Sequence, residues 1–108
     1  METLHKVYAS DCEVCQALRG HDEKVAAESG YKFNAIPLED MSGKTDNLSM
    51  YVVNYHVDKD GMVDVPIYMI TTGDDRPRIQ ASTVGKTIED VRALVTAWET
   101  YKSSQPTG

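Results

Sequence analysis

Two cysteines, Cys12 and Cys15, stand three residues apart in a chain of 108 residues that contains no other cysteine. Such a pair can form half of a zinc site, act as a reversible dithiol, or consist of two inert thiols. Structural zinc needs four ligands, but no second Cys-x-x-Cys is present, and His5, His21 and His56 are scattered and expected at the surface. The residues therefore favour redox chemistry, and we expect no metal.

The two cysteines are predicted to lie where a strand passes into a helix. Residues 4–9 form a run too short for a helix, and from residue 13 to 29 apolar positions recur at helical spacing, interrupted at Gly20. Free backbone N–H groups at a helix N-terminus stabilise a thiolate. Cys12 is therefore expected to be the nucleophile, and Cys15, one turn deeper, the resolving thiol.

The remaining elements complete the order βαβαββα. After the first helix, the pattern predicts a second strand at residues 32–38, a loop at 39–46 and an amphipathic helix at 48–55. It then predicts a hairpin at residues 67–83 with its turn at 73–77, and a last helix that begins at Thr87. The first βαβ unit should form parallel strands with a right-handed crossover. A capping box is expected at Thr87-x-x-Asp90. Core positions are expected at Tyr51, Tyr55, Met69 and Trp98.

Composition indicates one compact domain with protein or small-molecule partners. The net charge is −6, with 17 acidic against 11 basic residues and no basic run, which argues against nucleic acid or an anionic membrane as partner. No apolar stretch is long enough to span a membrane, and the start lacks the pattern of a signal peptide. We expect a cytoplasmic monomer with one domain at residues 1–102 and a flexible tail at 103–108.

From about residue 4 to about residue 101, the sequence resembles the thioredoxin superfamily. The segments KVYASDCEVCQ, VDVPIYMI and STVGKTIEDVRALV match the family's dithiol, its core strand opened by proline, and the glycine before its last helix. Gly20 falls where thioredoxins commonly have a helix-kinking proline. The resemblance implies a thiol–disulfide oxidoreductase with a four-stranded mixed sheet and flanking helices.

The resemblance also implies partners and a substrate groove. The partners would be disulfide-containing client proteins, such as a ribonucleotide reductase, and a thioredoxin-reductase-type electron donor, with no cofactor beyond the redox-active disulfide. Val65–Pro66 would carry a cis peptide bond beside the dithiol, since cis bonds are essentially confined to X–Pro. Substrate would bind there and at Val84 and Gly85. A plain edge-strand proline and a turn glycine remain the alternatives.

Departures from the family pattern suggest how the dithiol is tuned. The chain is expected to lack the N-terminal strand and helix of full thioredoxin, as in glutaredoxins and small viral thioredoxins. Asp11 replaces the usual aromatic residue, Glu13 and Val14 replace Gly-Pro, and Lys6 stands in place of a buried acid. Two carboxylates beside Cys12 disfavour its thiolate and favour a reducing couple.

Two questions stay open at this level: the role of Lys6, and whether the dithiol is functional or incidental. Lys6 could tune the site or be a solvated strand residue. The glutaredoxin pattern fails because Ala9 stands where a lysine is expected, so glutathione dependence is disfavoured. The chain could also be a thioredoxin-fold binding or assembly module in which the dithiol is incidental.

Overall fold

A computed structural model describes residues 1–41, 43–73 and 77–104. Its elements follow the predicted order, with the first predicted helix divided in two and a short 3-10 helix added. In chain order they are β1 (Thr3–Tyr8), α1 (Glu13–Leu18), α2 (His21–Glu28), β2 (Lys32–Pro37), η1 (Leu38–Met41), α3 (Asn47–Tyr55), β3 (Ile67–Thr72), β4 (Arg78–Val84) and α4 (Ile88–Ser104).

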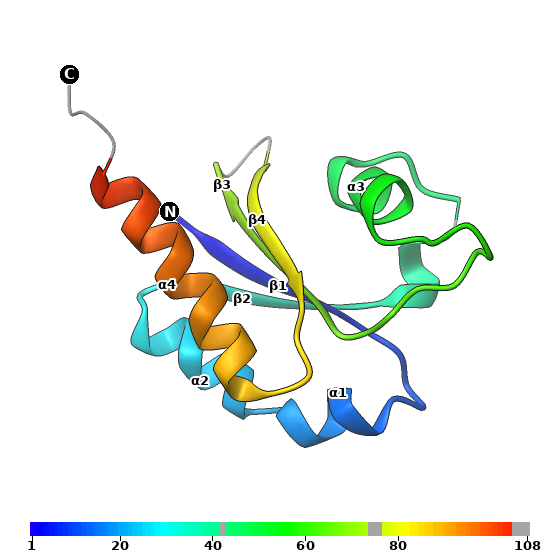
Figure 1. Cartoon of the computed structure of the whole chain (residues 1–108), viewed down its shortest axis with the longest axis horizontal. Coiled ribbons are helices and arrows are strands. Elements are labelled where there is room, and N and C mark those ends of the chain that lie inside the picture. The colour runs from blue at the N-terminus through cyan, green and yellow to red at the C-terminus, as the bar shows by residue number, and fades with distance from the viewer. Residues whose placement is uncertain (42, 74–76, 105–108) are drawn as a thin grey trace.

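The four strands form one mixed sheet in the order β2-β1-β3-β4. β1 and β2 are parallel, and β3 runs antiparallel to both β1 and β4. Figure 1 shows α1 and α2 forming the crossover between the parallel strands. The predicted parallel neighbours and the hairpin on the other edge are therefore confirmed.

The sheet separates two apolar clusters because successive strand residues point to opposite faces. Leu4 and Tyr68 face α1, α2 and α4, whereas Val7 and Met69 face α3. Figure 1 shows the same layers, with α2 and α4 on one side of the sheet and α3 on the other. The dithiol segment therefore lies on the side with three helices.

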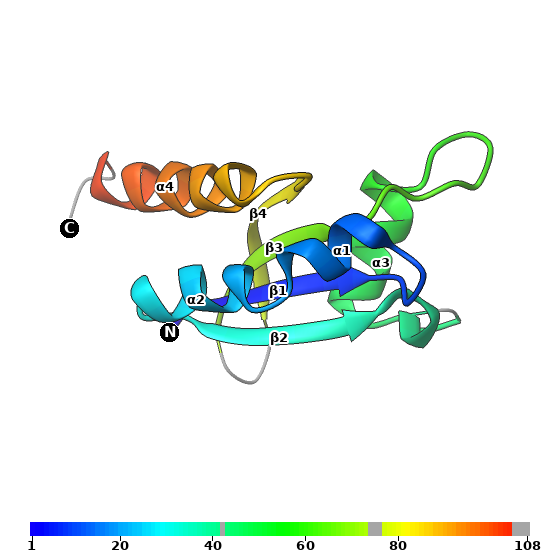
Figure 2. The same ribbon diagram turned by 90° about the horizontal axis from the view of Figure 1, so that it is seen from below.

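The predicted helix at residues 13–29 is two helices. Gly20 has a φ of 83°, a left-handed conformation that glycine adopts without steric cost, and it separates α1 from α2. Figure 2 shows the two helices as successive segments along the same side of the sheet. Gly20 thus ends the dithiol helix after Leu18 and sets the direction in which α2 begins.

His5 was expected at the surface, and that expectation is wrong. Its side chain is 6% exposed, and its ring nitrogens bond to the Thr71 hydroxyl at 2.8 Å and the Asn34 amide at 3.1 Å. Burial lowers the pKa of His5. These two partners satisfy a polar ring at a buried position in β1, which the sequence pattern does not reveal.

Other departures concern surfaces and boundaries. Tyr55 is 71% exposed rather than in the core, while Met69 and Trp98 are buried as expected. The expected loop at 39–46 begins within η1, and α4 continues to Ser104, beyond the expected domain end. The turn predicted at 73–77 and the tail at 103–108 include residues 74–76 and 105–108, which lie outside the described residues.

The capping box before α4 is present. The Asp90 carboxylate accepts the Thr87 backbone N–H at 3.1 Å, and the Thr87 hydroxyl accepts the Asp90 N–H at 3.3 Å. Within the described ranges, no helix is long and apolar enough to cross a lipid bilayer.

Candidate redox site

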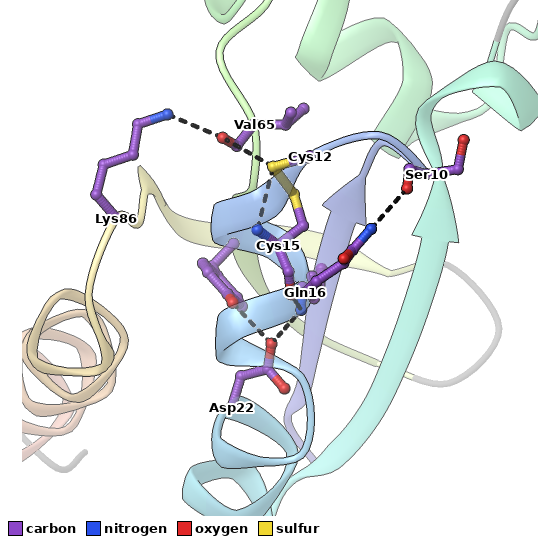
Figure 3. Close-up of a disulfide and its surroundings, with 9 residues drawn as sticks. Ser10, Cys12, Cys15, Gln16, Asp22, Val65 and Lys86 are labelled. Atoms are coloured by element: carbon purple, nitrogen blue, oxygen red, sulfur yellow. Dashed lines mark hydrogen bonds and ion pairs between the residues drawn. A yellow bond between two sulfur atoms is a disulfide. The ribbon is translucent and has the colours of Figure 1, made fainter.

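Cys12 and Cys15 form a disulfide at the start of α1. Cys12 is the N-cap residue, and its sulfur accepts the backbone N–H of Cys15 at 3.1 Å (Figure 3). Cys12 is partly exposed, whereas Cys15 is only 3% exposed. An outside molecule can therefore reach the first sulfur more easily than the second.

The turn between β1 and α1 presents Cys12 at the end of the sheet. The Cys12 backbone N–H donates to the Ala9 carbonyl at 3.2 Å. The Gln16 amide donates to the Ser10 carbonyl at 2.9 Å, so the first turn of α1 is tied back to the turn before it (Figure 3). These two bonds fix the backbone on both sides of the disulfide.

Val65 and Pro66 lie beside the dithiol, and the peptide bond between them is cis. The Val65 carbonyl oxygen is 3.9 Å from the Cys12 sulfur. A disulfide sulfur has no proton to donate, so in this oxidised form the approach is a contact. Pro66 is fully buried next to β3. The geometry brings together the two features that the sequence analysis associated with a groove.

Gly85 packs against Tyr68 and pairs with Pro66. Its N–H donates to the Pro66 carbonyl at 3.1 Å, and a Cβ at this position would lie 2.8 Å from the Tyr68 ring. Real Cβ atoms do not approach so closely, so this position requires glycine for space rather than for a turn. Val84 precedes it as the last residue of β4 and pairs with Ile67. Val65, Pro66, Val84 and Gly85 therefore lie in two adjoining segments.

Lys6 is buried, so the interpretation that it is a solvated strand residue is wrong. Its side chain is 5% exposed, and its ammonium donates to the Cys15 carbonyl at 2.8 Å and contacts the Asp22 carboxylate at 2.6 Å. A buried ammonium needs such partners because removing a charge from water is costly. Lys6, which lies on β1, thus connects the dithiol helix α1 to α2.

Asp22 is a site residue that the sequence analysis missed. It is 1% exposed, and the oxygen that contacts Lys6 also accepts the Tyr68 hydroxyl at 2.7 Å. Burial and the bond to Asp22 raise the pKa of Tyr68. One signal could have revealed it: Asp22 falls between Leu18 and Val25 on the apolar stripe of the helical pattern. A carboxylate on a buried stripe requires a buried partner.

Lys6, Asp22 and Cys15 also line one cavity of about 720 Å³ on this side of the sheet. Tyr8 and Phe33 contribute to its walls from β1 and β2. Cys15 is therefore bordered by a charged network and a cavity, whereas Cys12 is partly exposed.

The other predicted tuning residues surround Cys12 differently. Asp11 and Glu13 are exposed, while Val14 is partly buried and packs against the cluster that contains Leu18. The sequence analysis also missed Lys86, whose ammonium donates to the Val65 carbonyl at 2.9 Å (Figure 3). Nothing in the sequence pattern distinguishes Lys86 from other lysines near a helix start.

Comparisons with known proteins agree with this architecture. No protein-family model matches the sequence, and no curated protein does. Thioredoxin 1 of Thermosipho africanus superposes with a TM-score of 0.60 at 13% identity, covering 94% of this chain and 99% of that one.

Two other solved thioredoxins give similar values. A mutant thioredoxin from Halobacterium salinarum has a TM-score of 0.60 at 22% identity, covering 97% of this chain and 78% of that one. Thioredoxin f2, solved in complex with ferredoxin:thioredoxin reductase, has a TM-score of 0.58 at 15% identity, covering 94% and 77%. Identities this low carry information on the fold alone. With its four-stranded mixed sheet, flanking helices and Cys-x-x-Cys at the start of a helix, the chain has a thioredoxin-like fold.

Proposed function

We propose that the protein is a thiol–disulfide oxidoreductase that reduces disulfides in client proteins with the Cys12–Cys15 dithiol. The observation that carries this proposal is the asymmetry of the pair: a partly exposed N-cap sulfur that accepts a backbone N–H, followed by a buried sulfur. An accessible, hydrogen-bonded thiolate is the species that attacks a disulfide.

The reaction proceeds in two exchanges. The Cys12 thiolate attacks one sulfur of the client disulfide, which forms a mixed disulfide and releases the other client sulfur as a thiolate. The Cys15 thiolate then attacks the Cys12 sulfur, forming the Cys12–Cys15 disulfide and releasing the second client thiolate. The two client thiolates take up two protons, and two electrons pass from the dithiol to the client.

The buried network supports the second exchange. Cys15 must lose a proton before it attacks, and the Asp22 carboxylate supplies a base that lines the same cavity as Cys15. Lys6 holds that carboxylate and the Cys15 carbonyl together. In this proposal, the buried acid comes from α2 rather than from β1, where Lys6 stands.

The groove beside Cys12 binds the client in this proposal. Val65 and Val84, which are partly exposed, would contact the client, and the buried Pro66 and Gly85 join the two segments through the bond from the Gly85 N–H to the Pro66 carbonyl. An extended client segment would run along this backbone and present its disulfide to Cys12, with ribonucleotide reductase as one client class that the family resemblance suggests.

The oxidised protein needs a donor of two electrons to start again. A reductase of the thioredoxin-reductase class would supply them, and the solved complex of thioredoxin f2 with ferredoxin:thioredoxin reductase is a precedent for such a pairing. The proposal also includes a reducing, cytoplasmic setting, because a dithiol reductant is maintained in the reduced form there.

Insulin reduction by dithiothreitol tests the proposal. The protein should accelerate precipitation of the insulin B chain, and a Cys12→Ser variant should not. Lack of acceleration by the wild-type protein, with its disulfide shown to form and to be reduced, would favour the alternative of a binding or assembly module.

A further inference from the structure

Lys86 approaches the first sulfur through a shared backbone oxygen. The Val65 carbonyl oxygen accepts the Lys86 ammonium at 2.9 Å and lies 3.9 Å from the Cys12 sulfur (Figure 3). The ammonium and the sulfur are therefore no more than about 7 Å apart, which is within the screening length of about 8 Å at physiological ionic strength. A unit charge at this separation acts on a thiolate even in a partly solvated site.

The backbone that carries Lys86 is held in place on both sides. Gly85 before it donates to the Pro66 carbonyl and packs against the Tyr68 ring. The Lys86 N–H donates to the Asp90 carboxylate at 2.8 Å, as part of the cap of α4. The position from which the side chain extends is thus determined by the fold, although the side chain itself is exposed.

No carboxylate within the described residues pairs with the Lys86 ammonium, whose bond is to the Val65 carbonyl. Lys6, the other cation beside the dithiol, is engaged with Asp22 and the Cys15 carbonyl. The two lysines therefore bond to different backbone carbonyls around the disulfide, Lys6 to that of Cys15 and Lys86 to that of Val65.

Carboxylates adjoin Cys12 and Val65 in the chain. Asp11 and Glu13 flank Cys12, and Asp64 precedes Val65; all three are exposed. Asp90 is held by backbone N–H groups at the start of α4, and these bonds lower its pKa. The charges of Asp11 and Glu13, which flank the accessible sulfur, disfavour a thiolate, whereas that of Lys86 favours it.

We propose that Lys86 stabilises the Cys12 thiolate that forms when the disulfide is opened, and that it offsets the carboxylates around this sulfur. This inference rests on the proposed redox function. When dithiothreitol reduces the protein, its dithiol loses two electrons and becomes a cyclic disulfide, and the two cysteine sulfurs gain them. Cys12 then carries the negative charge that faces the Lys86 ammonium. Lys86 is a positioning residue, because it acts on the sulfur without taking part in the exchange.

The test measures Cys12 alone in a Cys15→Ser background and needs no client. Iodoacetamide alkylation of Cys12 at pH 6.5 should be about two- to fivefold slower with Lys86→Gln, because the fraction present as thiolate falls. The difference should shrink in 1 M NaCl. Lys86→Met should behave like Lys86→Gln, since both remove the charge while only glutamine can still donate to the Val65 carbonyl.

A matched control removes one positive charge elsewhere. Lys24, an exposed residue of α2, should give an unchanged alkylation rate when replaced by glutamine. In the two-cysteine protein, at a pH where reduced Cys12 is mostly thiolate, Lys86→Gln should shift equilibrium with a glutathione buffer toward the disulfide by a factor similar to the change in rate.

Three results would overturn the inference: equal rates for Lys86→Gln and the parent, an effect of Lys86→Met alone, or an equal effect of Lys24→Gln. The second would assign Lys86 to holding the carbonyl rather than to charge. A protein inactive toward insulin whose Cys12 still showed the Lys86 effect would reject the proposed function while leaving the electrostatic role intact.

Discussion

Cys12 and Cys15 are three residues apart, yet the charges near them differ in burial and in partners. Beside Cys15, Lys6 and Asp22 are at most 5% exposed and contact each other at 2.6 Å. Beside Cys12, Asp11 and Glu13 lie at the surface. Lys6 and Asp22 are therefore buried in the interior of the protein, whereas Asp11 and Glu13 are solvated at its surface.

This difference separates two kinds of electrostatic effect. A buried charge is weakly screened and stays only if its partner stays, so its removal affects folding as well as chemistry. Exposed charges are screened by water and salt, so they adjust a nearby thiolate without changing the fold. We expect the two sides of the disulfide to respond to substitution accordingly.

The largest expected effect concerns the sulfurs themselves. Cys12→Ser should abolish disulfide reductase turnover, because the attacking thiolate is lost. Cys15→Ser should instead accumulate mixed disulfides with clients through Cys12, detectable as adducts on non-reducing gels and by mass spectrometry. Adducts formed through Cys15 in the Cys12→Ser variant, and none through Cys12, would reverse the assigned roles.

The next effect tests the buried side. Asp22→Ala should lower the free energy of unfolding by about 3–5 kcal/mol, because the Lys6 ammonium is left buried without its carboxylate. Urea unfolding followed by circular dichroism measures the change. Combining Lys6→Met with Asp22→Leu should cost less than the sum of the two single losses, since neither charge then remains buried alone.

A surface ion pair provides the control for this comparison. Arg92 and Glu28 contact each other at 3.5 Å with side chains 54% and 48% exposed. Glu28→Gln should change the free energy of unfolding by less than about 1 kcal/mol. An equally small loss for Asp22→Ala would contradict the distinction between the two sides.

A third, smaller effect concerns a buried group that stays neutral. Burial lowers the pKa of His5 below its ordinary value of 6.5, so the unfolded chain binds a proton first as the pH falls. The free energy of unfolding should therefore decrease between pH 7.5 and pH 5.5. This range lies above the ordinary titration of carboxyl groups.

His56 must be separated from His5 in that measurement, because burial lowers its pKa as well. Urea unfolding at both pH values should show a smaller pH dependence for His5→Asn than for the wild-type protein. An unchanged slope in the variant would mean that other groups carry the pH dependence.

The smallest effect tests the exposed side. Replacing Asp11 by Asn and Glu13 by Gln should speed alkylation of Cys12 below neutral pH by roughly two- to fivefold, because less negative charge opposes the thiolate. It should also raise the reduction potential, since the reduced form gains stability. Equilibration with a glutathione buffer measures this potential.

The control replaces Glu28 by Gln and Asp40 by Asn, which removes the same total charge from exposed positions elsewhere. It should leave the alkylation rate unchanged. If the Asp11 and Glu13 variant also left it unchanged, their charge would be better explained by selection of clients with basic residues near the disulfide, an effect that added salt should weaken.

Local pattern was sufficient for the order of elements and for the position of the dithiol. The spacing of Cys12 and Cys15 after a short strand, and the capping box from Thr87 to Asp90, depend on neighbours in the chain, and the structure contains both elements. Gly20 marked the interruption of the helix, although the pattern did not show that it divides it in two.

What the tertiary structure decided is which distant side chains meet. Lys6 lies on β1 and Asp22 on α2, and the sequence pattern does not show that these two side chains contact each other. Likewise, only the approach of the start of α4 to Val65 brings Lys86 near Cys12. The periodicity of a sequence shows which residues of a helix or strand lie on its buried face. The contacts between different elements depend on how those elements pack in three dimensions.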